Sequence, residues 1–294
     1  MIRLAVISGK GGTGKTMITA ALAQLLPMNL VLADCDVDAA NLELLLSPTL
    51  IHKEPFMGMK AACIDPALCV QCGECEDHCR FASIEREDDT YQVNPLRCEG
   101  CAVCVHVCPA GAITMQPRQT GEIMYSETEW GHLVHARLVP GAGNSGLLVN
   151  EVKKTAMRLD GDRDLLLIDG PPGTGCPLIS TISGVDAALI VTEPSVSGLH
   201  DLKRVVTVCR QFGPRIMVAV NRFDLDTSLA ESIQRWCDEE GIPLIGLIPF
   251  DHAVIDSVRK GIPVTRAGPS PAVHAIREME SRLEQELAGC DSRG

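Results

Sequence analysis

Aromatic residues are scarce in this chain of 294 residues, since Phe, Trp and Tyr together make up only 3%. A core without large rings must be filled by Val, Ile, Leu and Ala, which is typical of a buried parallel sheet rather than of a surface that stacks nucleobases. Hydrophobic residues still make up 46% of the chain, which is long enough for one large core and a small accessory unit.

Positive charge is also in short supply, because 26 Lys and Arg residues stand against 38 Asp and Glu residues, for a formal net charge of −12. Such a surface repels nucleic acid and anionic lipid, and no local Lys/Arg cluster offsets the repulsion. The first residues contain neither a basic n-region nor an apolar run of signal-peptide length. We therefore expect a cytoplasmic protein with no nucleic-acid partner and no membrane insertion.

Cysteine, in contrast, is abundant, with 14 residues, and eight of them form two runs with the spacing C-x2-C-x2-C-x3-C. This spacing wraps the backbone around a cubane iron–sulfur cluster, and in paired runs the fourth cysteine ligates the cluster of the other run. The expected ligand sets of two [4Fe-4S] clusters are Cys69, Cys72, Cys75 and Cys108 for cluster 1, and Cys98, Cys101, Cys104 and Cys79 for cluster 2.

A pair of zinc knuckles is the alternative interpretation of these cysteines. Zinc sites, however, usually combine two CxxC pairs across a long spacer rather than two runs of four. In a reducing compartment, metal ligation is also favoured over disulfides. One departure from regularity is that Arg80 follows Cys79, whereas Pro109 follows Cys108.

Six apolar runs alternate with helical patterns, which predicts an α/β fold with a doubly wound, mostly parallel sheet. The runs are Leu4–Ile7, Leu30–Ala33, Leu165–Ile168, Ala187–Thr192, Ile216–Val220 and Leu244–Ile248. The cysteine-rich segment lies between the second and third runs and is flanked by prolines. We therefore expect an α/β domain over residues 1–54 and 118–294, with an inserted α+β ferredoxin-like domain over residues 55–117.

The first run leads directly into GKGGTGKT, a complete G-x-x-x-x-G-K-T phosphate loop between a strand and a helix. Its glycines allow backbone N–H groups to point at phosphate oxygens, and the helix adds the positive end of its dipole. Lys15 is expected to neutralise the β- and γ-phosphates, and the Thr16 hydroxyl to ligate Mg²⁺. The loop consists of Gly9, Lys10, Gly11, Gly12, Thr13, Gly14, Lys15 and Thr16.

With its extra lysine, Lys10, this loop resembles the deviant Walker A motif of MinD/ParA-type ATPases, a group that includes the nitrogenase iron protein and the Mrp-type cluster carriers. The resemblance covers roughly residues 1 to 54 and 118 to 294, and it implies ATP as the nucleotide and an ATP-dependent homodimer. In that family this lysine reaches the nucleotide of the partner, whereas taken alone Lys10 is a loop lysine in solvent.

The resemblance also implies roles for the acidic residues that follow two of the strands. Asp34 would lie near Mg²⁺, and Asp36 would position the attacking water, whereas Asp38 is an extra acid suited to the first turn of a helix. Asp169 matches the Walker B aspartate and would hold Mg²⁺ through water, with a helix cap as the alternative. Gly170 would sense the γ-phosphate through its N–H.

Two further positions are expected at the base of the nucleotide. Asn221 matches the adenine-reading asparagine of the family, although Asn221, Arg222 and Asp224 also imitate the guanine motif N-K-x-D. Pro249 either flanks the base or simply ends the last strand. ATP is therefore favoured over GTP by the resemblance alone.

Cys176 lies seven residues after Asp169, the offset at which the nitrogenase iron protein carries a cluster ligand that bridges its dimer. A small, half-buried cysteine at a helix start is the alternative interpretation.

Taken together, the motifs resemble MinD-superfamily ATPases with an inserted ferredoxin domain. This resemblance implies a Mg²⁺-dependent, homodimeric ATPase that couples ATP to the assembly or delivery of a metal–sulfur cluster for a client protein. An ATP-gated reductase and, with less support, an ATPase that positions cargo on a membrane or chromosome are the alternatives.

Overall fold

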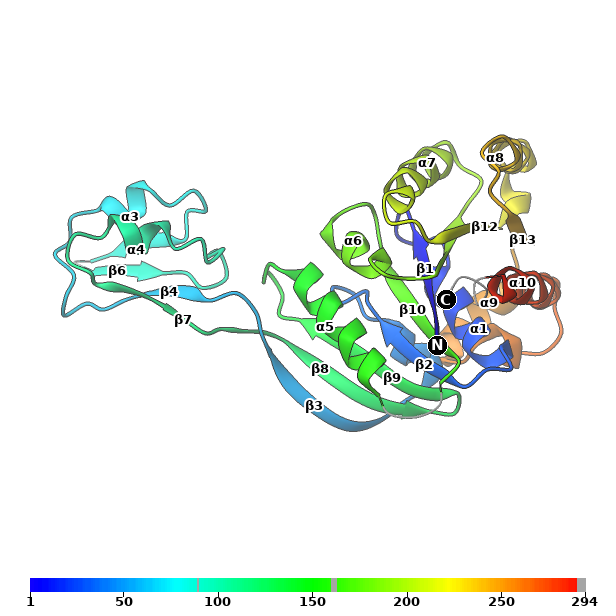
Figure 1. Cartoon of the computed structure of the whole chain (residues 1–294), viewed down its shortest axis with the longest axis horizontal. Coiled ribbons are helices and arrows are strands. Elements are labelled where there is room, and N and C mark those ends of the chain that lie inside the picture. The colour runs from blue at the N-terminus through cyan, green and yellow to red at the C-terminus, as the bar shows by residue number, and fades with distance from the viewer. Residues whose placement is uncertain (89, 160–162, 290–294) are drawn as a thin grey trace.

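The computed structural model describes residues 1–88, 90–159 and 163–289. Its main part is a nine-stranded sheet with helices on both faces (Figure 1) and the strand order β13-β12-β11-β1-β10-β2-β9-β8-β3. The strands of this sheet are β1 (Ile2–Ser8), β2 (Leu30–Asp34), β3 (Thr49–Met57), β8 (Gln119–Thr128), β9 (Gly131–Leu138), β10 (Leu165–Pro172), β11 (Ala187–Thr192), β12 (Arg215–Asn221) and β13 (Leu244–Ile248).

The six predicted strands all lie in this sheet and run parallel to one another, which confirms the expected α/β fold. β1 is central, with β10 and then β2 on one side and β11, β12 and β13 on the other. These strands are covered on both faces, and this is why they are near-continuous apolar runs in the sequence. Their carboxyl ends meet at one edge of the sheet, where parallel α/β folds place their ligands.

Three further strands extend the sheet beyond the predicted six. β9 pairs in parallel with β2, and β8 pairs antiparallel with both β9 and β3. β3 is the edge strand, and its first five residues, Thr49 to Lys53, are exposed. It carries Pro55, which a strand tolerates at an edge because one side of its backbone needs no hydrogen-bond donor.

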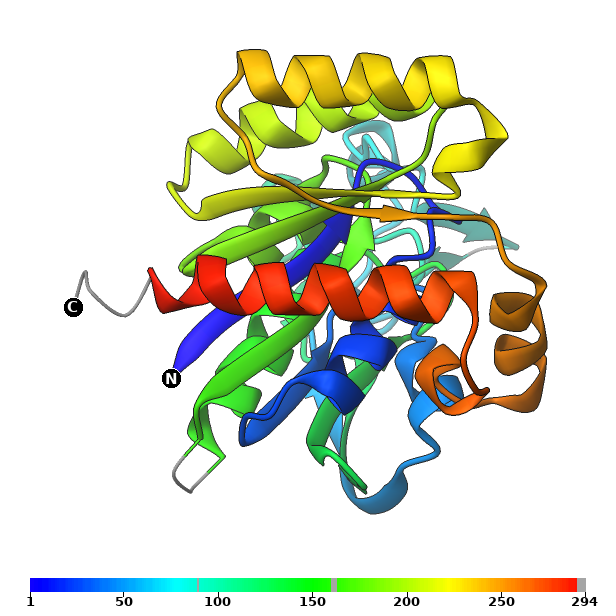
Figure 2. The same cartoon turned by 90° about the vertical axis from the view of Figure 1, so that its right-hand side faces the viewer.

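Helices form a layer on each face of the sheet. α1, α2 and α10 pack on one face, where Figure 2 shows α10 crossing the molecule next to α1, and α5 to α8 pack on the other. The helices are α1 (Lys15–Leu25), α2 (Leu42–Leu46), α5 (Ser145–Arg158), α6 (Cys176–Ile182), α7 (Val196–Arg210), α8 (Thr227–Glu239), α9 (His252–Lys260) and α10 (Pro271–Ala288), with single turns η1 (Phe223–Leu225) and η2 (Val264–Arg266). Within the described ranges, no helix is both long and apolar enough to cross a membrane.

Residues 58–118 form a small lobe that projects from the ends of β3 and β8 (Figure 1). In the lobe β4 pairs antiparallel with β7, and β5 with β6. Its elements are β4 (Ala61–Ile64), α3 (Glu74–Asp77), β5 (Ile84–Glu87), β6 (Thr90–Val93), α4 (Val103–Val107) and β7 (Ile113–Gln116). Residue 55, the expected start of the inserted domain, falls within β3, so residues 55–57 belong to the main sheet.

Candidate functional site

The predicted phosphate loop joins the carboxyl end of β1 to the amino end of α1 and lines a cavity of about 640 Å³. That volume is typical of a site for a small molecule. Gly14 has a φ of +92°, and a Cβ on it would lie 2.3 Å from the Asn221 side-chain nitrogen, so the turn requires glycine. Asp36, Asp38 and Pro171 line the same cavity.

Asp169, at the carboxyl end of β10, is completely buried and faces the start of α1. Its carboxylate accepts hydrogen bonds from Lys15 Nζ over 3.1 Å, from Thr16 Oγ1 over 2.8 Å and from Thr19 Oγ1 over 2.9 Å. Burial opposes the charge on Lys15, but the neighbouring carboxylates, Asp169 foremost, raise the pKa of its amine. The structure thus brings Thr16 and Asp169 together, and hydroxyl and carboxylate oxygens are the ligands that Mg²⁺ prefers.

Thr19 was not among the predicted site residues. It follows Lys15 by one helical turn and donates its hydroxyl to Asp169. The spacing i, i+4 on a helix that begins in a phosphate loop is the signal that indicates its place.

Asp34 and Asp36 follow β2, but the structure gives them different surroundings. Asp34 is completely buried, and its carboxylate accepts the backbone N–H groups of Asp36, Asn41 and Leu42 over 3.0, 3.2 and 3.1 Å. Burial, followed by repulsion from Asp169, raises the pKa of Asp34 to about 7. Asp34 therefore holds the start of α2 as well as lying beside Asp169, its register partner in the sheet.

Asp36, in contrast, lines the cavity. One of its oxygens lies 3.8 Å from Lys15 Nζ, and burial raises the pKa of its carboxyl group. The role of Asp36 in orienting water stays a prediction. Asp38 is exposed on the rim of the same cavity.

Asn221, at the end of β12, is buried and donates its side-chain N–H to the Thr13 carbonyl over 2.8 Å. It also lines an adjoining cavity of about 240 Å³ together with Arg222, Pro249 and Phe250. Asn221 therefore supports the phosphate loop as well as lining the second cavity. The two cavities adjoin, and Gly12 and Gly14 line both of them.

Gly170, the next residue of β10 after Asp169, lies where the chain passes very close to β1. A Cβ at this position would come within 2.7 Å of the Ile7 side chain and 3.0 Å of the Thr181 methyl group. Packing alone therefore requires glycine at position 170. The expected contact of its backbone N–H with the γ-phosphate stays a prediction.

Lys10 is partly exposed and has partners in the chain. Its Nζ lies 2.6 Å from the Glu193 carboxylate and donates to the hydroxyls of Ser195 and Ser197 over 3.0 and 2.9 Å. Ser195 is the amino-terminal cap of α7, and Glu193 also pairs with Arg222 at 3.0 Å. Glu193 is a second residue that the sequence analysis missed, because nothing in the spacing links it to the phosphate loop.

The eight cysteines of the two runs surround two cavities in the lobe. One cavity is lined by Cys69, Cys72, Cys75 and Cys108, and the other by Cys79, Cys98, Cys101 and Cys104. These two groups are the same as the two expected ligand sets. The fourth cysteine of each run lines the cavity of the other run. All cysteines in the described part of the chain are free thiols.

The donor set of each cavity consists of four thiols, which is the complement that a cubane cluster requires. No three His, Cys, Asp or Glu side chains of the described residues are placed to hold a single metal ion. The sulfurs line a cavity instead of meeting at one point. Cys176, the first residue of α6, is exposed and lies outside both sets.

Residues 4–264 match the model of the family described as the CobQ/CobB/MinD/ParA nucleotide binding domain. A protein of Methanocaldococcus jannaschii is 35% identical over 230 residues, which cover 76% of this chain and 78% of that protein. An iron-sulfur cluster carrier protein of Pyrococcus abyssi is 24% identical over 307 residues, with 97% of this chain and 86% of the relative covered.

The fold is also similar to solved structures. The septum site-determining protein MinD of Pyrococcus horikoshii, complexed with Mg-ADP, matches with a TM-score of 0.58 and 20% identity, over 98% of each chain. This likeness concerns the fold, whereas the family match covers most of the chain and includes the phosphate loop and Asp169. The chain therefore belongs to the CobQ/CobB/MinD/ParA nucleotide-binding family, and it is an ATPase.

Proposed function

We propose that this ATPase is a cytoplasmic maturation factor that delivers or reduces a metal–sulfur cluster for a client protein, and that its lobe is a ferredoxin-like domain with two [4Fe-4S] clusters. The observation that carries the proposal is the pair of cavities, each lined by four cysteines drawn from both runs. The lobe is attached through β3 and β8, which are strands of the same sheet that carries the nucleotide site.

At the nucleotide end, four side chains would carry out hydrolysis. Lys15 would bind the β- and γ-phosphates, and Thr16 and Asp169 would hold Mg²⁺, which would neutralise phosphate charge. Asp36, in the cavity and 3.8 Å from Lys15, orients the water that attacks the γ-phosphate. The proton of this water leaves with the phosphate or through the Asp36 carboxylate.

In the lobe, the thiolates of the two sets would hold the clusters, which supply one-electron transfer when bound. Cys75 and Cys98 are buried, whereas Cys72 and Cys101 are exposed, so each cavity has a covered side and an open side. The covered side shields a cluster from water, and the open side permits exchange of electrons with a partner.

The relatives named as iron-sulfur cluster carrier proteins support the maturation role, although they are only about 24% identical. The MinD proteins of similar likeness favour the alternative of a positioning ATPase. The net charge of −12 disfavours binding to an anionic membrane or to DNA.

The test begins with protein purified under strict anoxia. Iron and sulfide analysis should find about eight of each per chain, because each cubane contains four. The protein is then mixed with an apo-ferredoxin as a generic acceptor, with and without Mg²⁺-ATP, and the acceptor's cluster absorbance is followed. ATP-dependent reconstitution of the acceptor's cluster is expected for delivery, and stoichiometric zinc without iron would contradict the proposal.

An ATP-gated reductase is the second candidate, and one observation favours it. Each cavity supplies four thiols, so every iron of a cubane would have a protein ligand and the cluster would be a resident rather than a cargo. A second mixture separates the two roles: protein reduced with dithionite is combined with an oxidised ferredoxin that already holds its cluster. Iron labelled in this protein moves to the acceptor in cluster delivery but stays in place in electron transfer.

A further inference from the structure

The lobe touches the ATPase part at one distinctive point. Both carboxylate oxygens of Glu99, in the lobe, lie 3.2 Å from the place that a Cβ on Gly143 would occupy. Gly143 precedes Asn144, the residue that caps the amino end of α5 without a side-chain hydrogen bond to the helix. A carboxylate is thus held beside a helix end whose positive dipole and free N–H groups attract it.

Several buried side-chain polar atoms without a partner belong to the segments that join the lobe to the ATPase part. Among the described residues, such atoms include Arg118 Nε and Nη1, Thr120 Oγ1 and Asn144 Nδ2. Arg118 and Thr120 lie in the neck, by which we mean residues 58–60 and 117–120, where the two connecting segments enter the lobe. The loop of Asn144 lies alongside, because the Val139 N–H donates to the Thr120 carbonyl over 2.8 Å.

Unsatisfied groups of this kind are costly and rare, so their concentration at one junction requires an explanation. Glu99 offers an acceptor beside Gly143, and the next residue, Asn144, carries a side-chain donor without a partner. An arrangement in which the Glu99 carboxylate reaches Asn144 and the first N–H groups of α5 would give these donors an acceptor.

α5 is in turn bound tightly to α6. Lys153 of α5 donates to the carbonyls of Ser180, Thr181 and Ser183, each over 2.7 Å, and so closes the carboxyl end of α6. At the other end, a Cβ on Gly146 would lie 3.4 Å from Cys176, so the two helices are in close contact there as well. α5 and α6 must move together.

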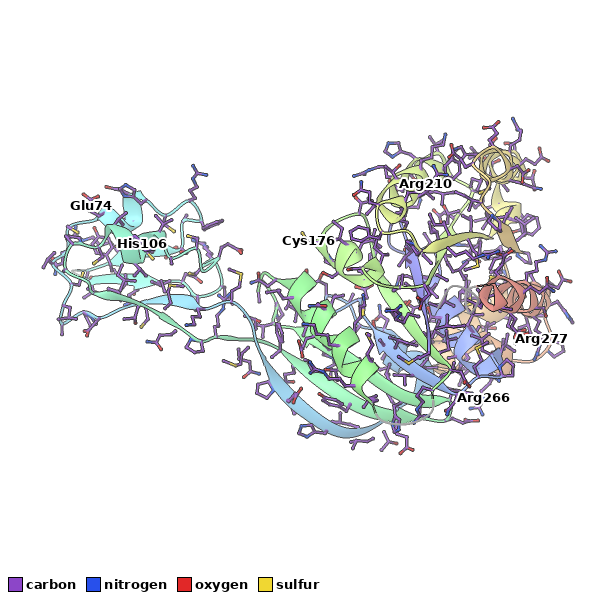
Figure 3. The ribbon with its side chains drawn as sticks, viewed as in Figure 1. Glu74, His106, Cys176, Arg210, Arg266 and Arg277 are labelled. Carbon is purple, nitrogen blue, oxygen red and sulfur yellow. The ribbon has the colours of Figure 1, made fainter. Side chains whose placement is uncertain are left out.

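α6 begins at the nucleotide site. Pro171, Pro172 and Pro177 line the cavity of the phosphate loop, and Pro177 is the second residue of α6. In Figure 3, Cys176 lies at the edge of the ATPase part that faces the lobe, whereas Glu74 lies at the far end of the lobe. A contiguous set of packed groups therefore runs from the nucleotide, through α6 and α5, to Glu99.

We propose that Glu99 is a latch by which the ATPase part controls the position of the lobe: it engages Asn144 and the amino end of α5 in one nucleotide state and releases them in the other. Glu99 follows Cys98, so the latch lies beside the cavity nearer to the ATPase part. The inference rests on the ATPase activity and on the lobe, and it does not require that the cavities hold iron or that a cluster is delivered.

The test is hydrogen–deuterium exchange of the full chain, purified under anoxia, with Mg²⁺-ADP and with a slowly hydrolysed ATP analogue. In the wild-type protein, exchange of residues 143–149 should differ between the two nucleotides by roughly two- to fivefold, the range expected for a carboxylate at a helix amino terminus. Glu99→Gln should abolish that difference, and Asn144→Gly should reduce it while keeping the left-handed backbone of residue 144.

Glu76→Gln is the matched control, because Glu76 also follows a cavity cysteine, Cys75, but lies on α3, away from the neck. This variant should keep the full difference. The proposal is overturned if wild-type exchange at residues 143–149 is the same with both nucleotides, or if Glu99→Gln retains the difference. Iron content and cluster transfer are measured in parallel. Failure of cluster delivery can then be distinguished from failure of the Glu99 latch, because each has its own measurement.

Discussion

Three carboxylates, two of them completely buried, lie around one buried amine in the nucleotide site. Asp169 and Asp34 are completely buried, and Asp36 lies 3.8 Å from Lys15 Nζ. Because Asp34 is occupied by backbone N–H groups and Asp169 by Lys15 and two threonines, Asp36 is the carboxylate among these three that remains directed to the cavity. The structure therefore separates two carboxylates that are engaged by protein groups from one that faces the cavity, and we propose that this one acts on water.

Substitution of Lys15 and of Asp36 should give different defects. Lys15→Ala should weaken nucleotide binding by roughly 100-fold or more, because it removes the positive charge opposite the phosphates and leaves buried carboxylates unpaired. Asp36→Ala should leave binding intact and slow hydrolysis by roughly 100-fold. Calorimetric titration with ADP and phosphate-release kinetics measure the two effects.

Asp38→Ala is the control for the second substitution, because Asp38 is an exposed acid on the rim of the same cavity. It should hydrolyse ATP at close to the wild-type rate. Wild-type turnover in Asp36→Ala would refute the assignment of Asp36.

At the level of elements, the pair of helices α5 and α6 depends on one buried amine. Lys153 satisfies three carbonyls at the end of α6, and Lys153→Met would leave them without a donor. We expect the free energy of unfolding to fall by about 3 kcal/mol at pH 7. Urea denaturation followed by circular dichroism measures the loss, and Lys154→Met, next to it in sequence, is the control.

Lys153 should also make the free energy of unfolding depend on pH, and the direction of the change follows from its pKa. Burial lowers the pKa of Lys153 to about 8 in the folded state, whereas an unfolded lysine titrates near 10.4. Between these values the unfolded chain binds more protons, so this group makes folding more favourable as pH rises from about 8 to 10. Subtracting the unfolding free energy of Lys153→Met from that of the wild type isolates this rise, and a flat difference would contradict it.

The elements that the sequence predicts are those with a strong local signal. The six central strands are apolar throughout because both faces are covered, and the phosphate loop requires glycines in a fixed pattern. β3 and β8 give no such signal, since β3 is an exposed edge strand whose place depends on pairing with a distant segment. The contact of Lys10 with Glu193 likewise joins segments far apart in sequence, and neither residue type indicates it alone.

The two cavities of the lobe allow the crossover of ligands to be tested. Cys108 belongs to the cavity of the first run and Cys79 to that of the second. Cys108→Ser should therefore give the same electron paramagnetic resonance signature as Cys72→Ser, and Cys79→Ser the same as Cys101→Ser. If Cys108→Ser instead resembled Cys101→Ser, each run would ligate its own cluster.

At the scale of the whole molecule, Lys10 pairs with Glu193 in the single chain. The resemblance to MinD/ParA-type ATPases implies that this lysine reaches the nucleotide of a second copy, and in that case ATP-driven dimerisation must break the pair. Lys10→Ala should lower the dimer fraction with a slowly hydrolysed ATP analogue, measured by analytical ultracentrifugation. Glu193→Gln should not lower the dimer fraction, because Lys10 can then leave its intrachain partner and reach the nucleotide of the second copy. If the dimer fraction of Lys10→Ala were unchanged, Lys10 would serve only to pair with Glu193 within one chain.

The last prediction concerns the coupling of the two ends of the molecule. The lobe is attached to the outer strands β3 and β8 of the sheet whose inner strands β2 and β10 carry Asp34 and Asp169, and through Glu99 it also approaches Gly143, just before α5. If the nucleotide binds two positions of the lobe with different affinity, it must shift the equilibrium between them by that difference. The electrostatic surroundings of the nearer cavity change with the position of Glu99, so its redox midpoint potential should change as well.

Because equilibrium coupling is reciprocal, reduction of the clusters should alter ATP affinity by the same factor by which ATP shifts the ratio of reduced to oxidised protein. We would titrate the midpoint potentials by electron paramagnetic resonance with and without Mg²⁺-ATP analogue, in the wild type and in Glu99→Gln. The wild type should show a shift confined to the signal that Cys101→Ser removes, and Glu99→Gln should show a smaller one. Identical potentials in all four titrations, with equal ATP affinity of oxidised and reduced protein, would mean that the lobe and the ATPase part work independently.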